Sequence, residues 1–207
     1  MRSLAFRAGV ALAALSCLCA LFLATAAWPS RVSANLIAGR AQEKVLETTP
    51  PIFNEPVQIT GAIAAKKAVK FGEKVAGGDD WLKGAKFRLK NSSGKKIVFI
   101  ELDVNFPETR ASGAEVSYRI NLGRIPNISH SAEPLSILPG AEVEADVDDK
   151  RYGDLVKLVE HRHRISDISR ALVQVGFVVF EDGTAWSAGV FYRQDAENPR
   201  RWLPIGH

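Results

Sequence analysis

The chain is poor in cysteine. Its 207 residues contain two, Cys17 and Cys19, and both lie in one apolar run near the N-terminus. If this run is removed as a signal peptide, the remaining chain has no cysteine, which excludes disulfides, thiolate nucleophiles and cysteine metal sites. A lipoprotein cysteine would end the apolar run, whereas here the run continues past Cys17 to Leu23. We therefore expect the fold to depend on its hydrophobic core alone.

Common catalytic motifs are missing as well. The sequence contains no G-x-G-x-x-G, no G-x-x-x-x-G-K-[ST], no G-x-S-x-G and no H-E-x-x-H. His161 and His163 approach metal spacing, but side chains two residues apart on a helix diverge. The acidic stretch over residues 142–149 lacks the glycine-containing loop of a calcium site. We expect a non-enzymatic protein with no metal and no other cofactor.

The chain has little excess charge. Its 27 Lys and Arg against 23 Asp and Glu give a net charge of +4, of which Arg2 and Arg7 supply two. A balance so close to neutral predicts no strong attraction to nucleic acid. With 46% hydrophobic and 24% charged residues, the composition is typical of a globular domain, and the length allows one domain with extensions.

The N-terminus predicts export. Arg2 and Arg7 precede an apolar run over residues 8–23, and Ala24-Thr25-Ala26 places small residues at the −3 and −1 positions of a cleavage site. This pattern predicts a signal peptide over residues 1–26. A retained anchor is the alternative, because residues 8–28 are uncharged and long enough to span a bilayer. We expect a periplasmic or extracellular protein, or one held at the inner membrane by this segment.

Residues 27–55 show no sustained hydrophobic period and predict a tether between the export segment and the domain. A short helix could form over residues 35–45, and Pro50 and Pro51 would end any helix there. The folded domain is then expected over residues 56–207.

That domain shows the alternating pattern of β-strands. Apolar side chains alternate over residues 96–106 and again over 85–89, and Asn91-Ser92-Ser93-Gly94 between them predicts a hairpin over residues 84–106. Residues 170–180 are almost all apolar, as in a central strand, and Asp182-Gly183 predicts a turn into a return strand over 184–193. Further strands are expected at 56–63, 67–72, 116–122 and 141–147.

One helix interrupts the strands. Tyr152, Leu155, Val156 and Val159 follow helical spacing behind a capping aspartate, Asp148 or Asp149, and predict a helix of about residues 150–162. Seven or eight strands with one short helix predict a mainly β fold, an antiparallel immunoglobulin-like β-sandwich. A closed barrel is the alternative.

Two groups of residues are candidate binding sites. Asp79 and Asp80 precede Trp81 in a glycine-led loop, which could bind carbohydrate if the indole formed an exposed platform. The simpler interpretation is that Trp81 plugs an edge of the sandwich.

The second group consists of Trp202 with Arg200 and Arg201, together with Phe99 if that ring is exposed. Aromatic and arginine side chains are enriched at protein interfaces. Edge packing is the simpler alternative for these residues too.

Several stretches together resemble an uncharacterised family of exported bacterial proteins with an immunoglobulin-like β-sandwich. The stretches that carry the resemblance are Asp80-Trp81-Leu82, residues 90–97 (KNSSGKKI), residues 105–109 (NFPET), Leu138-Pro139-Gly140, residues 180–186 (FEDGTAW) and residues 198–202 (NPRRW). The resemblance covers about residues 56–203. It implies a secreted sandwich and supplies no activity, cofactor or catalytic residue.

These observations predict an exported, non-enzymatic β-sandwich protein with a binding or structural role at the cell envelope. We expect a protein partner or an envelope or glycan partner, no nucleic acid, and membrane contact only through residues 8–28 if the signal is not cleaved. The alternative is an extracytoplasmic carbohydrate-binding or carbohydrate-active module that uses Trp81 with Asp79 and Asp80.

Overall fold

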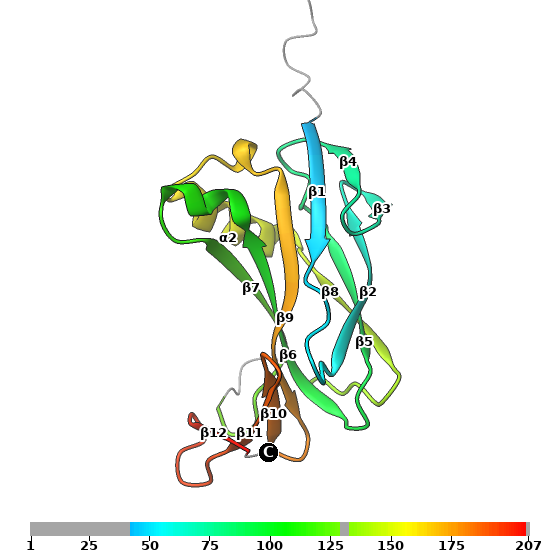
Figure 1. Cartoon of the computed structure of the whole chain (residues 1–207), viewed down its shortest axis with the longest axis vertical. Coiled ribbons are helices and arrows are strands. Elements are labelled where there is room, and N and C mark those ends of the chain that lie inside the picture. Colours follow the sequence, from blue (N-terminus) through cyan, green and yellow to red (C-terminus); the bar gives the residue numbers. More distant parts are fainter. Residues whose placement is uncertain (1–41, 129–132, 206–207) are drawn as a thin grey trace, which may run out of the picture. The chain divides into compact units, whose positions relative to one another are not determined.

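The computed structural model describes residues 42–128 and 133–205 (Figure 1). The expected signal peptide or anchor and the first part of the expected tether lie outside these residues. The described part is mainly β, as predicted, and consists of two sheets, one α-helix and two short 3₁₀ helices. No helix in residues 42–128 or 133–205 is both long and apolar enough to cross a membrane.

The structure forms twelve strands within these residues, more than the seven or eight expected. Their bounds are β1 (Gln42–Thr48), β2 (Val57–Ala64), β3 (Lys67–Val69), β4 (Lys74–Gly77), β5 (Lys86–Asn91), β6 (Ile97–Phe106), β7 (Val116–Gly123), β8 (Glu142–Asp146), β9 (Arg170–Phe180), β10 (Thr184–Ser187), β11 (Val190–Gln194) and β12 (Trp202–Pro204).

The larger sheet is built around β9, which is the central strand predicted by its apolar run. One edge of β9 pairs with β6, and β7 lies beyond β6. The other edge is shared, because its first half pairs with β1 and its second half with β10 (Figure 1). β4 continues the sheet beyond β1, and β11 and β12 continue it beyond β10. All these pairings are antiparallel except β1 with β9, which is parallel.

The smaller sheet has the order β3-β2-β5-β8 and faces the larger one across a common hydrophobic core. Phe87 and Leu89 of β5 are buried in this core, as are Leu102 and Val104 of β6. The period-two alternation of both strands therefore does place one face of each sheet inside the sandwich.

The helix α2 (Asp149–Glu160) confirms the sequence prediction closely. Asp148 is its N-cap and accepts a hydrogen bond from the Arg151 amide at 2.7 Å. Leu155 and Val159 bury the apolar stripe of the helix in the common core, where α2 packs against β7.

The tether predicted over residues 27–55 is wrong for residues 42–48, which form β1. Leu46 is fully buried, and its carbonyl accepts a hydrogen bond from the Gly72 amide at 2.8 Å. Residues 42–45, the last part of the short helix expected over 35–45, are therefore strand; residues 35–41 lie outside the described residues. A strand of seven residues between β4 and β9 takes its stability from partners distant in sequence, which no local pattern reveals.

The hairpin predicted over residues 84–106 is also wrong, although both of its strands exist. β5 belongs to the smaller sheet and β6 to the larger one, so the turn between them crosses the sandwich. The buried Asn91 holds this crossing, because its side-chain amide donates to the carbonyls of Lys95 and Ile137. Turn composition predicts a reversal of the chain but does not specify which strands pair.

The turn at Asp182-Gly183 is confirmed, and β9 and β10 form the predicted hairpin. The return strand expected over 184–193 is instead two strands, β10 and β11, that pair with each other. Ala188 and Gly189 both have positive φ, at 49° and 85°, and make the reversal between them.

Candidate functional site

The loop with Asp79, Asp80 and Trp81 does not form an aromatic platform. The Trp81 side chain is only 1% exposed, and its carbonyl accepts a hydrogen bond from the Ala65 amide at 2.7 Å. Asp79 and Asp80 are exposed beside it. The interpretation that Trp81 plugs an edge of the sandwich is confirmed, since its side chain belongs to the core. Trp81 is therefore wrong as a binding residue, and the carbohydrate-binding alternative loses the exposed surface it required.

Trp202 is half-buried in a small aromatic cluster on the outer face of the larger sheet. Its ring meets Phe177 edge-on, with centroids 5.3 Å apart, and Phe177 meets Phe99 at 6.4 Å. Phe99 is 6% exposed, so the expectation that it is an exposed anchor is wrong. Arg200 and Arg201 are exposed, and Arg201 lies 4.0 Å from the Asp195 carboxylate.

A different candidate site lies beside the turn between β5 and β6. A hollow of about 420 Å³, here called the turn pocket, lies between the loop that follows β1, the turn between β5 and β6, and the aromatic residues of β9 and β11. Its lining residues are Asn54, Glu55, Pro56, Ser92, Ser93, Gly94, Lys95, Phe180 and Phe191.

Residues 52–55 form a tight turn at the rim of this pocket. The Glu55 amide donates to the Ile52 carbonyl, and the Ile52 amide donates back to Glu55 Oε2, both at 3.0 Å. Asn54 takes the left-handed conformation that the turn requires, with φ of 57°. The turn projects Phe53, which is 75% exposed, the largest value for a large hydrophobic side chain in the described residues.

The 52–55 turn is supported from both sides. The Ser92 hydroxyl donates to the Glu55 carbonyl at 3.3 Å, and the Ser92 amide donates to the Pro56 carbonyl at 2.9 Å. On the other side, the β10–β11 turn lies close to Ile52, because a Cβ built on Gly189 would be 3.3 Å from Ile52 Cγ2. Phe53 is therefore presented by a braced turn.

The floor of the pocket is aromatic and carries a fixed cation. Phe180 is buried and Phe191 half-buried, and their rings stack with centroids 6.5 Å apart. The Lys95 ammonium lies 5.4 Å from the Phe180 ring centroid, within the range of a cation–π contact.

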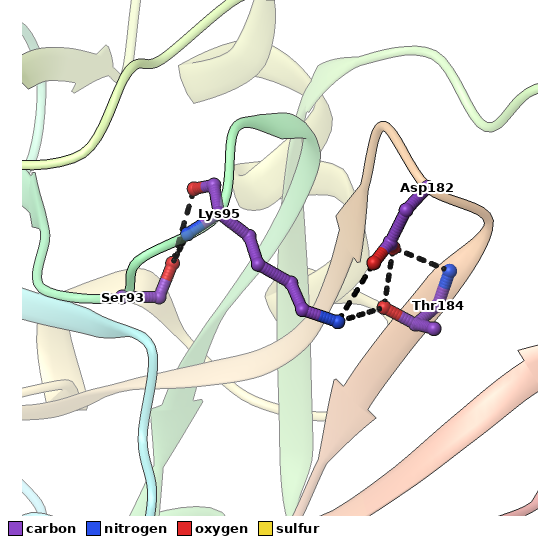
Figure 2. Close-up of polar contacts among 4 residues, drawn as sticks. All are labelled: Ser93, Lys95, Asp182 and Thr184. Carbon is purple, nitrogen blue, oxygen red and sulfur yellow. Dashed lines mark hydrogen bonds and ion pairs between the residues drawn. The ribbon is translucent and has the colours of Figure 1, made fainter.

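Figure 2 shows how Lys95 links two turns. Its Nζ lies 2.7 Å from Asp182 Oδ2 and donates to Thr184 Oγ1 at 3.0 Å, while the Thr184 amide and hydroxyl donate to Asp182 Oδ1. Partial burial raises the pKa of Asp182, but the hydrogen bonds from Lys95 and Thr184 outweigh it and hold the pKa below its usual range. The charge of Lys95 is thus matched within the protein.

Ser93 and Lys95 do not form a nucleophile and base. Ser93 Oγ donates to the Lys95 carbonyl and accepts from the Lys95 amide, whereas the ammonium extends away towards Asp182 (Figure 2). These contacts order the turn. In the described part of the chain, no group of three or more His, Cys, Asp or Glu side chains could hold a metal ion.

Glu55 is the unmatched charge of the turn pocket. Within the described residues no Lys, Arg or His forms an ion pair with it, whereas Lys95, the other charged residue that lines the pocket, is paired with Asp182. Burial raises the pKa of Glu55, and the hydrogen bond from the Ile52 amide offsets this only in part. The pocket therefore presents one carboxylate that has no cationic partner among the described residues, beside the aromatic ring of Phe191.

Sequence reasoning missed this site. The run Pro50-Pro51-Ile52-Phe53 was interpretable as the end of a tether, yet two prolines before two large apolar residues describe a stiff segment that projects a hydrophobic tip. Phe180 and Lys95 are separated from that run in sequence, and no spacing rule connects them with it.

Comparison with known proteins places the chain in no class: no family model, no curated protein and no solved structure matches it. The resemblance to exported bacterial proteins therefore stays a prediction from the stretches that carry it. Function is argued below from the site itself.

Proposed function

We propose that this protein is an exported, non-enzymatic β-sandwich that binds a protein partner at the cell envelope through the turn pocket and Phe53. The observation that carries the proposal is the position of Phe53, which is 75% exposed on a braced turn beside a pocket with aromatic walls. Aromatic side chains next to such pockets are typical anchors of protein interfaces.

The N-terminal sequence supports the location. The arginine-flanked apolar run and the Ala24-Thr25-Ala26 site are those of an exported chain, cleaved or retained as an anchor. We place the domain in the periplasm or outside the cell, where a sandwich without cysteine remains independent of redox conditions.

Site-specific photocrosslinking in a bacterial host tests this function. The full-length chain carries benzoylphenylalanine in place of Phe53, a change from one exposed aromatic residue to another. The matched control carries it in place of Leu158, which is also exposed (43%) but lies on α2. We expect a discrete crosslinked protein in the envelope fraction from position 53 and none from position 158. Equal crosslinking at both positions, or none at 53, would contradict the proposal.

A further inference from the structure

We propose that the turn pocket recognises a lysine or arginine side chain of the protein partner, while Phe53 and Ile52 receive an apolar residue next to it. This inference rests on the proposed binding function and names the chemistry of the partner.

The first argument is charge. Two charged side chains line the pocket, Glu55 and Lys95, and Lys95 already has Asp182 as its partner at 2.7 Å. Glu55 has no cation among the described residues, so the pocket and its immediate support carry one uncompensated negative charge. A ligand of opposite charge supplies the missing partner, and a charge-assisted hydrogen bond to a carboxylate is stronger than a neutral one.

The second argument is the shape and chemistry of the walls. The half-buried ring of Phe191 gives the pocket an apolar wall, Phe180 and Pro56 are buried behind it, and the pocket volume is about 420 Å³. Lysine and arginine combine an apolar stem with a charged head, so the stem can pack on the Phe191 ring while the head reaches the carboxylate. A purely apolar ligand would leave Glu55 buried and unpaired, which is costly.

The third argument is that the turn itself does not need the charge. Glu55 accepts one hydrogen bond from the Ile52 amide, and the side-chain carbonyl of glutamine could accept the same bond. The protein thus keeps an acid where burial opposes ionisation, and a cationic ligand would relieve this cost. Residues that lower stability in the free protein are common at binding sites.

Apolar surface beside the pocket explains the choice of a protein partner. Phe53 and Ile52 are 75% and 37% exposed and adjoin the pocket through Asn54 and Glu55. A free amine would leave this surface uncovered, whereas a peptide that carries an apolar residue next to its basic one covers both parts.

The test uses the full-length chain, purified in mild detergent and immobilised for surface plasmon resonance. The probes are the capped peptides Ala-Arg-Leu-Ala, Ala-Lys-Leu-Ala and Ala-Gln-Leu-Ala. For the unchanged chain we expect the Arg and Lys peptides to bind about tenfold more tightly than the Gln peptide, the effect of one charge-assisted hydrogen bond. This preference should shrink as salt is raised.

Two variants complete the design. Glu55→Gln should abolish the preference for the basic peptides, while the matched control Glu73→Gln, at an exposed acid paired with Lys70, should keep it. Phe53→Ala should weaken the binding of all three peptides by the same factor. Thermal melting followed by circular dichroism verifies that each variant is folded.

Several results would overturn the inference. Equal binding of the Arg and Gln peptides, or a preference that survives in Glu55→Gln, would remove the role of Glu55. Arginine amide that binds as tightly as the Arg peptide would indicate a small amine as ligand. Self-association of the chain that Phe53→Ala abolishes would make a second copy the occupant. If the crosslink from position 53 persists unchanged in Glu55→Gln, the proposed function stands and this inference falls.

Discussion

Lys44 is a charged side chain placed fully inside the sandwich. Its Nζ donates to the Ile168 carbonyl at 2.8 Å and to Gln42 Oε1 at 3.1 Å. Loss of hydration lowers the pKa of Lys44, and the negative charges of Asp79, Glu108 and Asp167 offset this only in part. The ammonium therefore costs folding free energy at neutral pH.

Replacement of Lys44 by methionine tests this cost. Because the pKa is lowered in the folded state, the native protein binds fewer protons than the unfolded chain between the folded pKa and the unfolded value of about 10.4. The unchanged protein therefore gains stability as pH rises through this interval. Lys44→Met should lose this gain, yet stay within about 1 kcal/mol of the unchanged protein at pH 7, because the lost hydrogen bonds offset the removed desolvation.

Urea denaturation of both proteins at pH 7 and pH 10 measures the difference. Other groups that titrate between pH 7 and pH 10 contribute equally to both proteins and cancel in the comparison. If the free energy of unfolding changed between pH 7 and pH 10 by the same amount in both proteins, the Lys44 ammonium would not be desolvated.

At the scale of the elements, the end of β7 requires a glycine. Gly123 has a φ of 77°, and a Cβ built on it would lie 2.3 Å from the Val98 carbonyl oxygen and 2.5 Å from Leu135 Cβ. Both the conformation and the lack of space exclude a side chain at this position.

We expect Gly123→Ala to lower the free energy of unfolding by about 3 kcal/mol, from left-handed strain and the clash with backbone together. The matched control is Gly183→Ala, which has the same φ of 77° but no atom within 4 Å of a built Cβ. It should cost only about 1 kcal/mol, the strain alone. Urea denaturation compares the two, and equal losses would refute the role of the close approach.

The link between Lys95 and Asp182 joins the β5–β6 turn to the β9–β10 turn. Both side chains are about half exposed, so a double-mutant cycle with Lys95→Met and Asp182→Asn should give a coupling of about 0.5 kcal/mol at pH 7. Because the pKa of Asp182 is lowered, this contribution is complete above the unfolded pKa of about 3.9 and is lost as pH falls through the folded value. Thermal melting of the four proteins at pH 7 and pH 2.5 measures it. A coupling that is the same at pH 2.5 as at pH 7 would rule out the ion pair as its source.

At the scale of the whole molecule, β1 belongs to the folded domain. It fills the edge of β9 along residues 170–173, pairs with β4 on its other side and buries Leu46 in the core. Its removal would expose one edge of β9 and one edge of β4 and would open the core.

A chain of residues 56–207 should therefore fail to unfold cooperatively, whereas a chain of residues 42–207 should show one sharp transition. The loss of the Leu46 side chain alone should lower the free energy of unfolding by about 3 kcal/mol, and the lost strand pairing adds to this. The combined loss is comparable with the total free energy of unfolding of a typical domain. Near-ultraviolet circular dichroism and urea denaturation distinguish the two chains. A cooperative transition for residues 56–207 would return residues 42–48 to the role of a tether.

Local pattern determined much of the secondary structure. The alternation in β6 and β7, the apolar run of β9, the turn at Asp182-Gly183 and the helical stripe of α2 are all visible in the sequence. Each depends on neighbours within a few residues, because side-chain period and turn chemistry are local properties. They sufficed to predict a mainly β fold with one helix.

Pairing and burial were decided by the tertiary structure. The sequence alone did not reveal that β5 and β6 lie in different sheets or that β1 pairs in parallel with β9, and it left the burial of Trp81 and Phe99 open. Nor did it bring Phe53 and Glu55 together with Lys95 and Phe180. Contacts between segments distant in the chain decide all of these, and each segment's own pattern fits several partners equally well. The predicted export signal and the strands thus depend on local information, whereas the turn pocket exists only once the chain has folded.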